Sequence, residues 1–270
     1  MAPKILVVCV IYNEKLQETI TYKSLLIHCE NIFIIDNSPI PFNPSSYLQK
    51  GWTYQNHPEN IGLSKAYNEA AKFASDNGYD WILLCDQDTY FPSNALQYYI
   101  DAIKNNPTVN LFCPRVKLDT GEYMSPTPIK NYLTSLSDRS IFGEFSLSKF
   151  CVINSGMLIN VSAFISVGGY NDLVWLDFSD IQFIERFKNK YKNAYALSIE
   201  CIQSFSNKDT DFEKKLKRFT IFCQSIKNFI PTEKWKKLWI LIVVLRRATS
   251  LSVQNKTTKP FSIFYKNYLQ

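Results

Sequence analysis

Histidine, glycine and long apolar runs are scarce in this chain of 270 residues, and each scarcity excludes a class of protein. With His28 and His57 as the only histidines, neither a zinc site nor a Ser-His-Asp triad is expected. Only 8 glycines are present, which excludes collagen-like and linker-like chains. No apolar run reaches the roughly 18 to 20 residues that cross a membrane. The glycine patterns of Rossmann and P-loop phosphate cradles do not occur either.

The composition that remains is that of a folded protein. Hydrophobic residues make up 46% of the chain and charged residues 20%, so the chain can bury a core and is not globally disordered. Its length fits one large domain, or one domain with an appendage. Seven cysteines occur without a Cys-x-x-Cys pair, and several lie in apolar, strand-like runs. We therefore expect reduced, buried cysteines in a cytoplasmic protein.

Charge is distributed unevenly along the chain. From Lys208 onward there are 14 basic and 4 acidic residues, whereas the preceding part holds 16 and 20. This predicts a catalytic domain over residues 1–207 and a basic helical extension over residues 208–270, and it is unlike a nucleic-acid-binding domain. Within the extension, residues 233–247 place lysines and arginines around an apolar segment with two tryptophans. Such a segment either lies on an anionic membrane surface or packs on the main domain, and both interpretations stay open.

Strand-like and helix-like segments alternate along the first part of the chain. Apolar runs predict strands at residues 4–12, 31–36, 52–56, 79–85, 111–118 and 150–161. Helical patterns cover residues 14–29, 63–76, 92–105 and 180–191. Residues 119–148 lack clear periodicity, so we expect a long loop or lid there. The alternation predicts an α/β fold with a mostly parallel sheet flanked by helices, where ligands bind at the carboxyl ends of the strands.

Two carboxylates follow the strand that ends at Cys85. Asp86 and Asp88, separated by Gln87, can point to the same side and share a cation or a sugar-nucleotide. Oxygen ligands of this kind suit Mg²⁺ or Mn²⁺. With Thr89, the same residues also fit the Asp-x-Asp-x-Thr pattern of haloacid dehalogenase-type phosphatases. That alternative stays open, although the phosphatase nucleophile normally leaves the first strand and two strong strands precede it here.

Several segments occur in an order typical of one family. They are Val-Cys-Val-Ile-Tyr-Asn-Glu at 8–14, Ile-Ile-Asp-Asn-Ser at 34–38, Asn-Ile-Gly-Leu-Ser-Lys-Ala-Tyr-Asn at 60–68, Trp-Ile-Leu-Leu-Cys-Asp-Gln-Asp-Thr at 81–89, Asn-Ser-Gly-Met-Leu-Ile at 154–159, Gly-Gly-Tyr-Asn-Asp at 168–172 and Trp-Leu-Asp-Phe-Ser-Asp-Ile-Gln-Phe-Ile-Glu-Arg at 175–186. Over residues 4–206 this ordered set resembles the family 2 glycosyltransferases with a GT-A fold, and their bacterial rhamnosyltransferase-like branch in particular. The resemblance implies a nucleotide-binding half at about residues 1–118 and an acceptor half at about residues 150–207.

The resemblance also implies which residues bind the nucleotide-sugar. Tyr12, Asn13 and Glu14 would border the nucleotide. Asp36 would accept the N3–H of a uracil or thymine base, unless it only forms a turn. Asn60, together with Gly62 and Asn68, would close the nucleotide pocket, unless Asn60 only caps the helix that follows. Asp86 would lie near the ribose, and Asp88 would bind a Mg²⁺ or Mn²⁺ ion that bridges the diphosphate.

Inversion at the sugar needs a base that deprotonates the acceptor hydroxyl. Asp177 and Asp180 match the acidic pair before the acceptor-side helix, with Asp177 the first choice for the base and Asp180 the second. Asp180 could instead cap that helix, and Glu185 and Arg186 are expected to be structural charges. Where many relatives carry a histidine that completes the metal or phosphate site, this chain has Gln203, a poor ligand for a transition metal.

The implied activity is inverting transfer of a sugar, L-rhamnose from dTDP-rhamnose or otherwise a sugar from a UDP-sugar, to a bacterial surface glycan or lipid-linked acceptor. The enzyme would work in the cytoplasm, or at the inner face of the cell membrane through its basic extension. A non-catalytic nucleotide-sugar-binding protein is the other alternative that the sequence leaves open.

Overall fold

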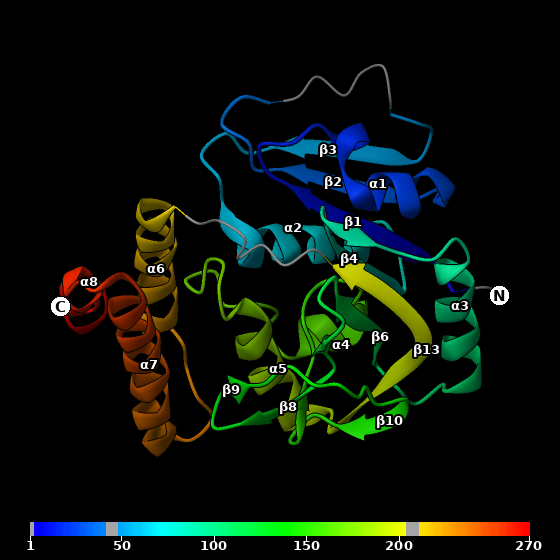
Figure 1. Cartoon of the computed structure of the whole chain (residues 1–270). Coiled ribbons are helices and arrows are strands. Elements are labelled where there is room, and N and C mark those ends of the chain that lie inside the picture. Colours follow the sequence, from blue (N-terminus) through cyan, green and yellow to red (C-terminus); the bar gives the residue numbers. More distant parts are fainter. Residues whose placement is uncertain (1–2, 42–47, 204–210) are drawn as a thin grey trace.

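A curled sheet runs through the main part of the chain (Figure 1). The computed structural model describes residues 3–41, 48–203 and 211–270. The sheet is formed by β1 (Ile5–Ile11), β2 (Ile32–Asp36), β3 (Trp52–Asn56), β4 (Trp81–Asp86), β5 (Thr89–Tyr90), β6 (Leu111–Leu118), β7 (Tyr123–Ser125), β10 (Gly143–Ser146), β12 (Leu158–Asn160) and β13 (Asn193–Gln203). The order along its main path is β10-β13-β6-β12-β4-β1-β2-β3, with β5 beside β13 and β7 beside β6.

Most neighbouring long strands run parallel. β1 pairs in parallel with both β2 and β4, β2 with β3, and β6 with β13. The short strand β12 runs antiparallel between β4 and β6 and so joins the two parallel blocks. A second, three-stranded sheet contains β8 (Thr127–Lys130), β9 (Leu133–Thr134) and β11 (Phe150–Cys151). The predicted α/β class with a mostly parallel sheet is confirmed.

Helices cover both faces of the sheet because its strands are apolar on both sides. In β1, Leu6, Val8 and Val10 face one core while Val7 and Cys9 face the other. The first core is covered by α2 (Gly62–Asp76), α4 (Val161–Ser166) and α5 (Ser179–Lys190), and the second by α1 (Ile20–Ser24) and α3 (Ala95–Asn105). Continuous apolar strands of this type are typical of sheets buried on both faces.

The basic extension is helical and is joined to the first core. It contains α6 (Phe212–Lys227), α7 (Lys237–Asn255) and α8 (Lys259–Phe264), which Figure 1 shows as a bundle at one side of the molecule. Ile240, Val243 and Val244 of α7 are buried in the same apolar cluster as the residues under the sheet. Among the described residues, no helix is both long and apolar enough to cross a membrane.

The structure corrects four sequence-based expectations about the elements. The helix expected at residues 14–29 is broken into α1 and two 3-10 turns, Leu16–Glu18 and Leu26–His28, because Thr19 is extended and caps a new helix by accepting a hydrogen bond from the Tyr22 N–H. The long loop expected at residues 119–148 contains β7, β8, β9 and β10. The strand expected at residues 150–161 is divided between β11, β12 and the first residue of α4. Strand β13 was not expected at all.

All seven cysteines are buried and none forms a disulfide. Burial raises the pKa of Cys29 and of Cys223 to about 12, so these thiols stay protonated at neutral pH. The expectation of buried, unpaired cysteines is therefore confirmed.

Candidate active site

The ends of three parallel strands bring the predicted donor-site residues to one edge of the sheet. In the β1–β4 ladder Val10 lies opposite Asp86, and in the β1–β2 ladder Ile11 lies opposite Asp36. Tyr12 follows directly and is half exposed at this edge. The far end of β13 reaches the same region, since Gln203 pairs with Thr89 just after the Asp-Gln-Asp segment. The carboxyl ends of parallel strands are where such sheets bind ligands.

Asp86 lies at the centre of a group of interacting carboxylates. Its Oδ1 accepts a hydrogen bond of 3.2 Å from the Tyr67 hydroxyl of α2, and its N–H donates to the Ser155 hydroxyl at 3.3 Å. Burial, together with the negative charges of Asp88 and Asp180, raises the pKa of Asp86 to about 7. Acidic side chains from β4, the following turn and α5 therefore share one field, which would attract a cation.

Gln203, for which the family resemblance implied a histidine, lies beside Asp88. Its Nε2 donates to the Asp88 Oδ1 at 3.0 Å, while its Oε1 is buried without a hydrogen-bond partner. Burial raises the pKa of Asp88, and the Gln203 hydrogen bond opposes that shift. The remainder of this predicted stretch, residues 204–206, and the predicted domain boundary at residue 207 lie outside the described residues.

These groups can be tested as a metal site. No set of three or more His, Cys, Asp or Glu side chains in the described part of the chain is placed to hold a metal ion. The Asp88 carboxylate and the orphaned Gln203 carbonyl oxygen are nevertheless hard oxygen donors, and Mg²⁺ characteristically takes few protein ligands and completes its shell with water and substrate phosphates. The donors present thus fit an oxygen-preferring cation held largely by its substrate.

The loop after β1 is shaped by a residue that the sequence analysis treated only as a spacer. The Gln87 Oε1 accepts from the Tyr12 N–H at 2.7 Å, and its Nε2 donates to the Glu14 Oε2 at 2.7 Å. Asn13 has a positive φ of 53° and its N–H donates to the Ser38 hydroxyl at 2.8 Å. Burial and the charge of Asp88 raise the pKa of Glu14. Gln87 therefore connects the loop of Tyr12, Asn13 and Glu14 to the Asp-Gln-Asp turn.

Asp36 is fully buried and forms the turn that was considered as its alternative role. Its Oδ1 accepts from the Ser38 N–H at 2.9 Å and its Oδ2 from the Tyr54 hydroxyl at 2.6 Å.

The Asn60 and Gly62 pair lets the two halves of the domain meet. Asn60 has φ 54°, and its Oδ1 accepts from the Gly62 N–H at 3.1 Å. The Trp175 Nε1 donates to the Asn60 carbonyl at 3.2 Å, and the Leu63 N–H donates to the Trp175 carbonyl at 2.9 Å. At Gly62, which has φ +80°, an added Cβ would lie 2.6 Å from that carbonyl oxygen. Only glycine fits there, because Trp175 covers the start of α2.

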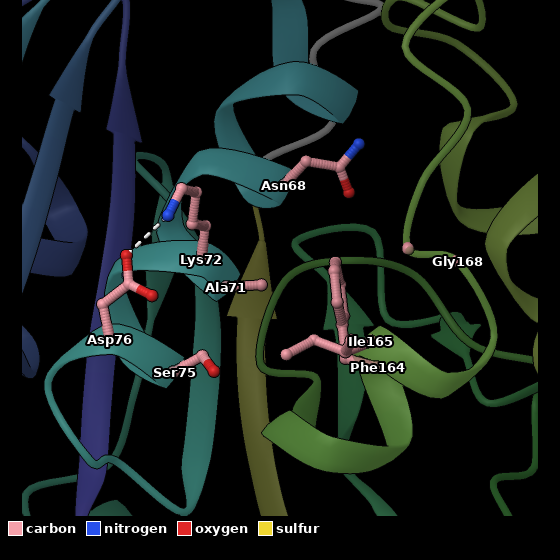
Figure 2. Close-up of a pocket in the computed structure, with 9 residues that line it drawn as sticks. Asn68, Ala71, Lys72, Ser75, Asp76, Phe164, Ile165 and Gly168 are labelled. Atoms are coloured by element: carbon pink, nitrogen blue, oxygen red, sulfur yellow. Dashed lines mark hydrogen bonds and ion pairs between the residues drawn. The ribbon is translucent and has the colours of Figure 1, made fainter.

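The Asn68 side chain makes its hydrogen bonds to the loop before α5. Its amide donates to the Tyr170 carbonyl at 3.0 Å and to Asp172 at 2.6 Å, and its Oδ1 accepts from the Tyr170 N–H at 2.9 Å. These bonds fasten the loop before α5 to α2. Asn68 also lines a cavity of about 350 Å³ between α2 and α4, where Figure 2 shows it above the Lys72–Asp76 ion pair. Apart from Asn68, no residue predicted for the donor site or as the base lines this cavity.

The two candidate bases have different surroundings. Asp177 is held by Arg218 of α6, with Nε–Oδ2 at 3.0 Å and Nη2–Oδ1 at 2.7 Å, and the Arg247 Nη1 lies 4.0 Å from its Oδ2. Asp180 lies in the first turn of α5, whose N-cap position is Phe178, and its Oδ1 accepts a hydrogen bond from the Ile181 N–H at 2.7 Å. Burial raises the pKa of Asp180 to about 6, and the charge of Asp177 contributes in the same direction.

Two further charged residues of α5, Glu185 and Arg186, make structural contacts. Glu185 accepts from Tyr132 at 3.0 Å and pairs with Lys188 at 2.6 Å. Arg186 donates to the carbonyls of Gly168 and Gly169 at 3.2 and 3.1 Å. Both side chains hold neighbouring segments together, as expected from the sequence.

The sequence model of the family described as "Glycosyl transferase family 2" matches residues 6–168, more than half of the chain. The chain belongs to this family. No curated protein matches at a significant level.

Solved structures of transferases share the fold. TarS from S. aureus, residues 1–349 in complex with UDP-GlcNAc, is 16% identical at a TM-score of 0.53, with 93% of this chain and 74% of that chain covered. GalNAc-T7, solved with UDP, GalNAc and Mn²⁺, is 10% identical at a TM-score of 0.55, with 98% of this chain and 56% of that chain covered. The expected GT-A-like fold is thereby confirmed, and glycosyl transfer is supported over the phosphatase alternative.

Proposed function

We propose that the protein is an inverting glycosyltransferase whose donor binds at the carboxyl ends of β1, β2 and β4. The observation that carries the proposal is the convergence of Asp86 and Asp88, at the end of β4, with Asp180 of α5, which comes from a segment far away in sequence. Tyr12, Asn13 and Glu14 would border the nucleotide, Asp36 would contact the base, and Asn60 would close the pocket. Asp86 would lie near the ribose.

A divalent cation, Mg²⁺ or Mn²⁺, would be held by Asp88 with the Gln203 carbonyl oxygen. When bound, such an ion neutralises the charge that develops on the leaving diphosphate. The likeness to GalNAc-T7, whose structure contains Mn²⁺, supports this assignment. The buried, unpartnered Gln203 oxygen gives it a basis in this chain.

We assign the base to Asp180 and reverse the order expected from the sequence. Each Asp177 oxygen accepts a hydrogen bond from Arg218, so this carboxylate is engaged by the helical extension. Asp180 makes no such ion pair among the described residues; burial raises its pKa to about 6, and its charge acts on Asp86. At neutral pH Asp180 is mostly ionised yet a better proton acceptor than an ordinary carboxylate, as a base requires.

For the donor we propose dTDP-rhamnose, on the resemblance to the rhamnosyltransferase-like branch, with a UDP-sugar as the alternative. The nucleotides in the TarS and GalNAc-T7 structures support the alternative. The acceptor would be a bacterial surface glycan or a lipid-linked saccharide.

We further propose that the protein is a peripheral membrane protein. It would contact the anionic inner face of the cell membrane through residues at the start of α7. Ile240, Val243 and Val244 are buried in the first core, so most of the apolar segment is not available to a membrane. Trp235 and Leu238 remain 62% and 61% exposed, with Lys234 and Lys237 exposed beside them in sequence. We call these four residues the Trp235 surface. Basic residues near an anionic surface contribute about 1 kcal/mol each, and the two apolar side chains would add burial.

A donor panel tests the proposed activity. The wild-type protein is incubated with dTDP-rhamnose, UDP-hexoses, UDP-galactofuranose or GDP-mannose, with Mg²⁺, Mn²⁺ or EDTA, and nucleotide release is measured. We expect one donor to be turned over, with slow hydrolysis even without acceptor. Binding of a sugar-nucleotide without turnover under any condition would favour the non-catalytic alternative.

A further inference from the structure

Two arginines of the helical extension converge on the acceptor side of the site. Arg218 comes from α6 and Arg247 from α7, and both approach Asp177, three residues before Asp180. Their side chains are 50% and 35% exposed, so their guanidinium groups remain accessible to a ligand.

The arginines are held firmly in place. The Arg247 guanidinium lies 4.2 Å from the centre of the Phe222 ring, a cation–π contact that fixes its plane. The extension itself is fastened to the segment around Asp177: Phe178 packs edge-on against Phe222, and Gln182 exchanges two hydrogen bonds with the backbone of Ile230, at 3.1 and 2.7 Å. The position of the pair is therefore set by packing and does not depend on the ion pair alone.

The charges at this point do not balance within the described residues. Two guanidinium groups face one carboxylate, and Arg247 makes no hydrogen bond there, since its nearest carboxylate oxygen is 4.0 Å away. Burial lowers the pKa of Arg247, and the nearby Arg218 charge acts in the same direction. A guanidinium has five N–H donors in a planar fork that matches phosphate, and a second anion would remove the excess positive charge.

We propose that Arg218 and Arg247 form a binding site for a phosphate group of the acceptor, a proposal that rests on the proposed transferase function. The anion would take the free N–H groups of Arg247 and share those of Arg218 with Asp177. A phosphate bound there would place the acceptor hydroxyl on the α5 side, where Asp180 lies. The phosphate belongs either to the terminal phosphate of a lipid-linked saccharide or to a phosphodiester in a glycan backbone.

Binding of small phosphates separates these possibilities. Benzyl phosphate stands for a terminal phosphate, dimethyl phosphate for a phosphodiester, and benzyl alcohol is the uncharged control. Each is titrated by saturation-transfer NMR with Mg²⁺, with and without saturating UDP or dTDP, whichever the donor panel selects. We expect benzyl phosphate or dimethyl phosphate, but not benzyl alcohol, to bind whether or not the nucleotide is present, and the tighter ligand identifies the source.

Matched variants test the assignment. Arg218→Gln and Arg247→Gln should each weaken phosphate binding at least tenfold and leave nucleotide affinity unchanged. Arg246→Gln, the same charge change at an exposed neighbour on α7, should alter phosphate binding less than twofold. Asp177→Asn removes the competing carboxylate and should tighten phosphate binding, which a loss of folding could not do.

Several results would overturn the proposal. These are absence of phosphate binding to the wild type, an equal effect of Arg246→Gln, or a loss of nucleotide affinity in Arg247→Gln as large as the loss for phosphate, which would assign the arginines to the donor. If no nucleotide binds at all, the proposed transferase function fails, while the phosphate titrations alone still decide whether the arginine site exists.

Discussion

The Gln203 amide donates a 3.0 Å hydrogen bond to the Asp88 carboxylate across 115 residues of sequence. This contact joins the end of β13 to the turn after β4, because Gln203 also pairs with Thr89 in the sheet. It makes the two residues a unit in which one oxygen of each remains available for a cation.

Asp88→Ala should abolish the effect of divalent cations on nucleotide binding, because it removes the only carboxylate assigned to the ion. Calorimetric titration of UDP or dTDP with and without Mn²⁺ measures this effect. Gln203→His should instead strengthen the Mn²⁺ effect by roughly tenfold, since imidazole is a better ligand for Mn²⁺ than an amide oxygen. An unchanged metal effect in Asp88→Ala would remove Asp88 from the metal site.

Asp180→Asn should stabilise the folded protein at pH 7.5 by roughly 1 to 2 kcal/mol. The folded-state pKa of about 6 lies above the ordinary value of 3.8. Between pH 3.8 and about 6, Asp180 is therefore protonated in the native state and ionised in the unfolded chain. Wild-type stability from this group therefore falls as the pH rises from about 4 to 6, and the asparagine variant does not pay that penalty. Urea unfolding at pH 4 and pH 7.5 measures it. A gap between variant and wild type that does not grow with pH would contradict the assigned shift.

Gly62→Ala should destabilise the protein by roughly 2 to 4 kcal/mol, because the new methyl group meets Trp175 and the backbone has a positive φ. Gly78→Ala is the matched control. Its φ of +69° imposes similar backbone strain, but nothing lies within 4 Å of the added Cβ, so about 1 kcal/mol is expected there. Thermal unfolding of the two variants compares them, and equal losses would show that the contact with Trp175 carries no cost.

The double variant Trp235→Ser and Leu238→Ser should lose binding to anionic vesicles in a flotation assay. Wild-type binding should weaken with salt, since it combines apolar insertion with lysine charges. Val253→Ser removes an equally exposed apolar residue near the other end of α7 and should bind as the wild type does. If the wild type floats with neither kind of vesicle, the Trp235 surface has no membrane role, and equal flotation with neutral and anionic vesicles would show that its lysines do not contribute.

The sequence predicted the parts of the fold that depend on local pattern. Strands β3 and β6 begin and end at the expected residues, because their β-branched, aromatic and aliphatic residues favour an extended backbone. Strand β13 was missed because its stability comes from pairing with β6, more than 80 residues away, which no local pattern reveals. The strands within residues 119–148 have two to four residues each, too few to show a period of two.

The same distinction applies to the candidate site. The order of the segments was enough to bring Asp86, Asp88 and Asp36 to one edge, because they follow parallel neighbouring strands. Sequence could not rank Asp177 against Asp180, since the arginine that engages Asp177 comes from α6, 41 residues later. Gln87 was treated as a spacer, although its amide connects the loop after β1 to the acidic turn.

The rate of nucleotide release by Asp180→Asn, compared with Asp177→Asn and wild type on the donor that the panel selects, tests most directly whether Asp180 is the base. Donor affinity should be retained in both variants, because both side chains keep their size and neither borders the nucleotide. We expect a loss of roughly 10²- to 10⁴-fold for Asp180→Asn, the usual contribution of a positioned base, and of less than about tenfold for Asp177→Asn. Near-normal release by Asp180→Asn together with an inactive Asp177→Asn would contradict the assignment of the base to Asp180.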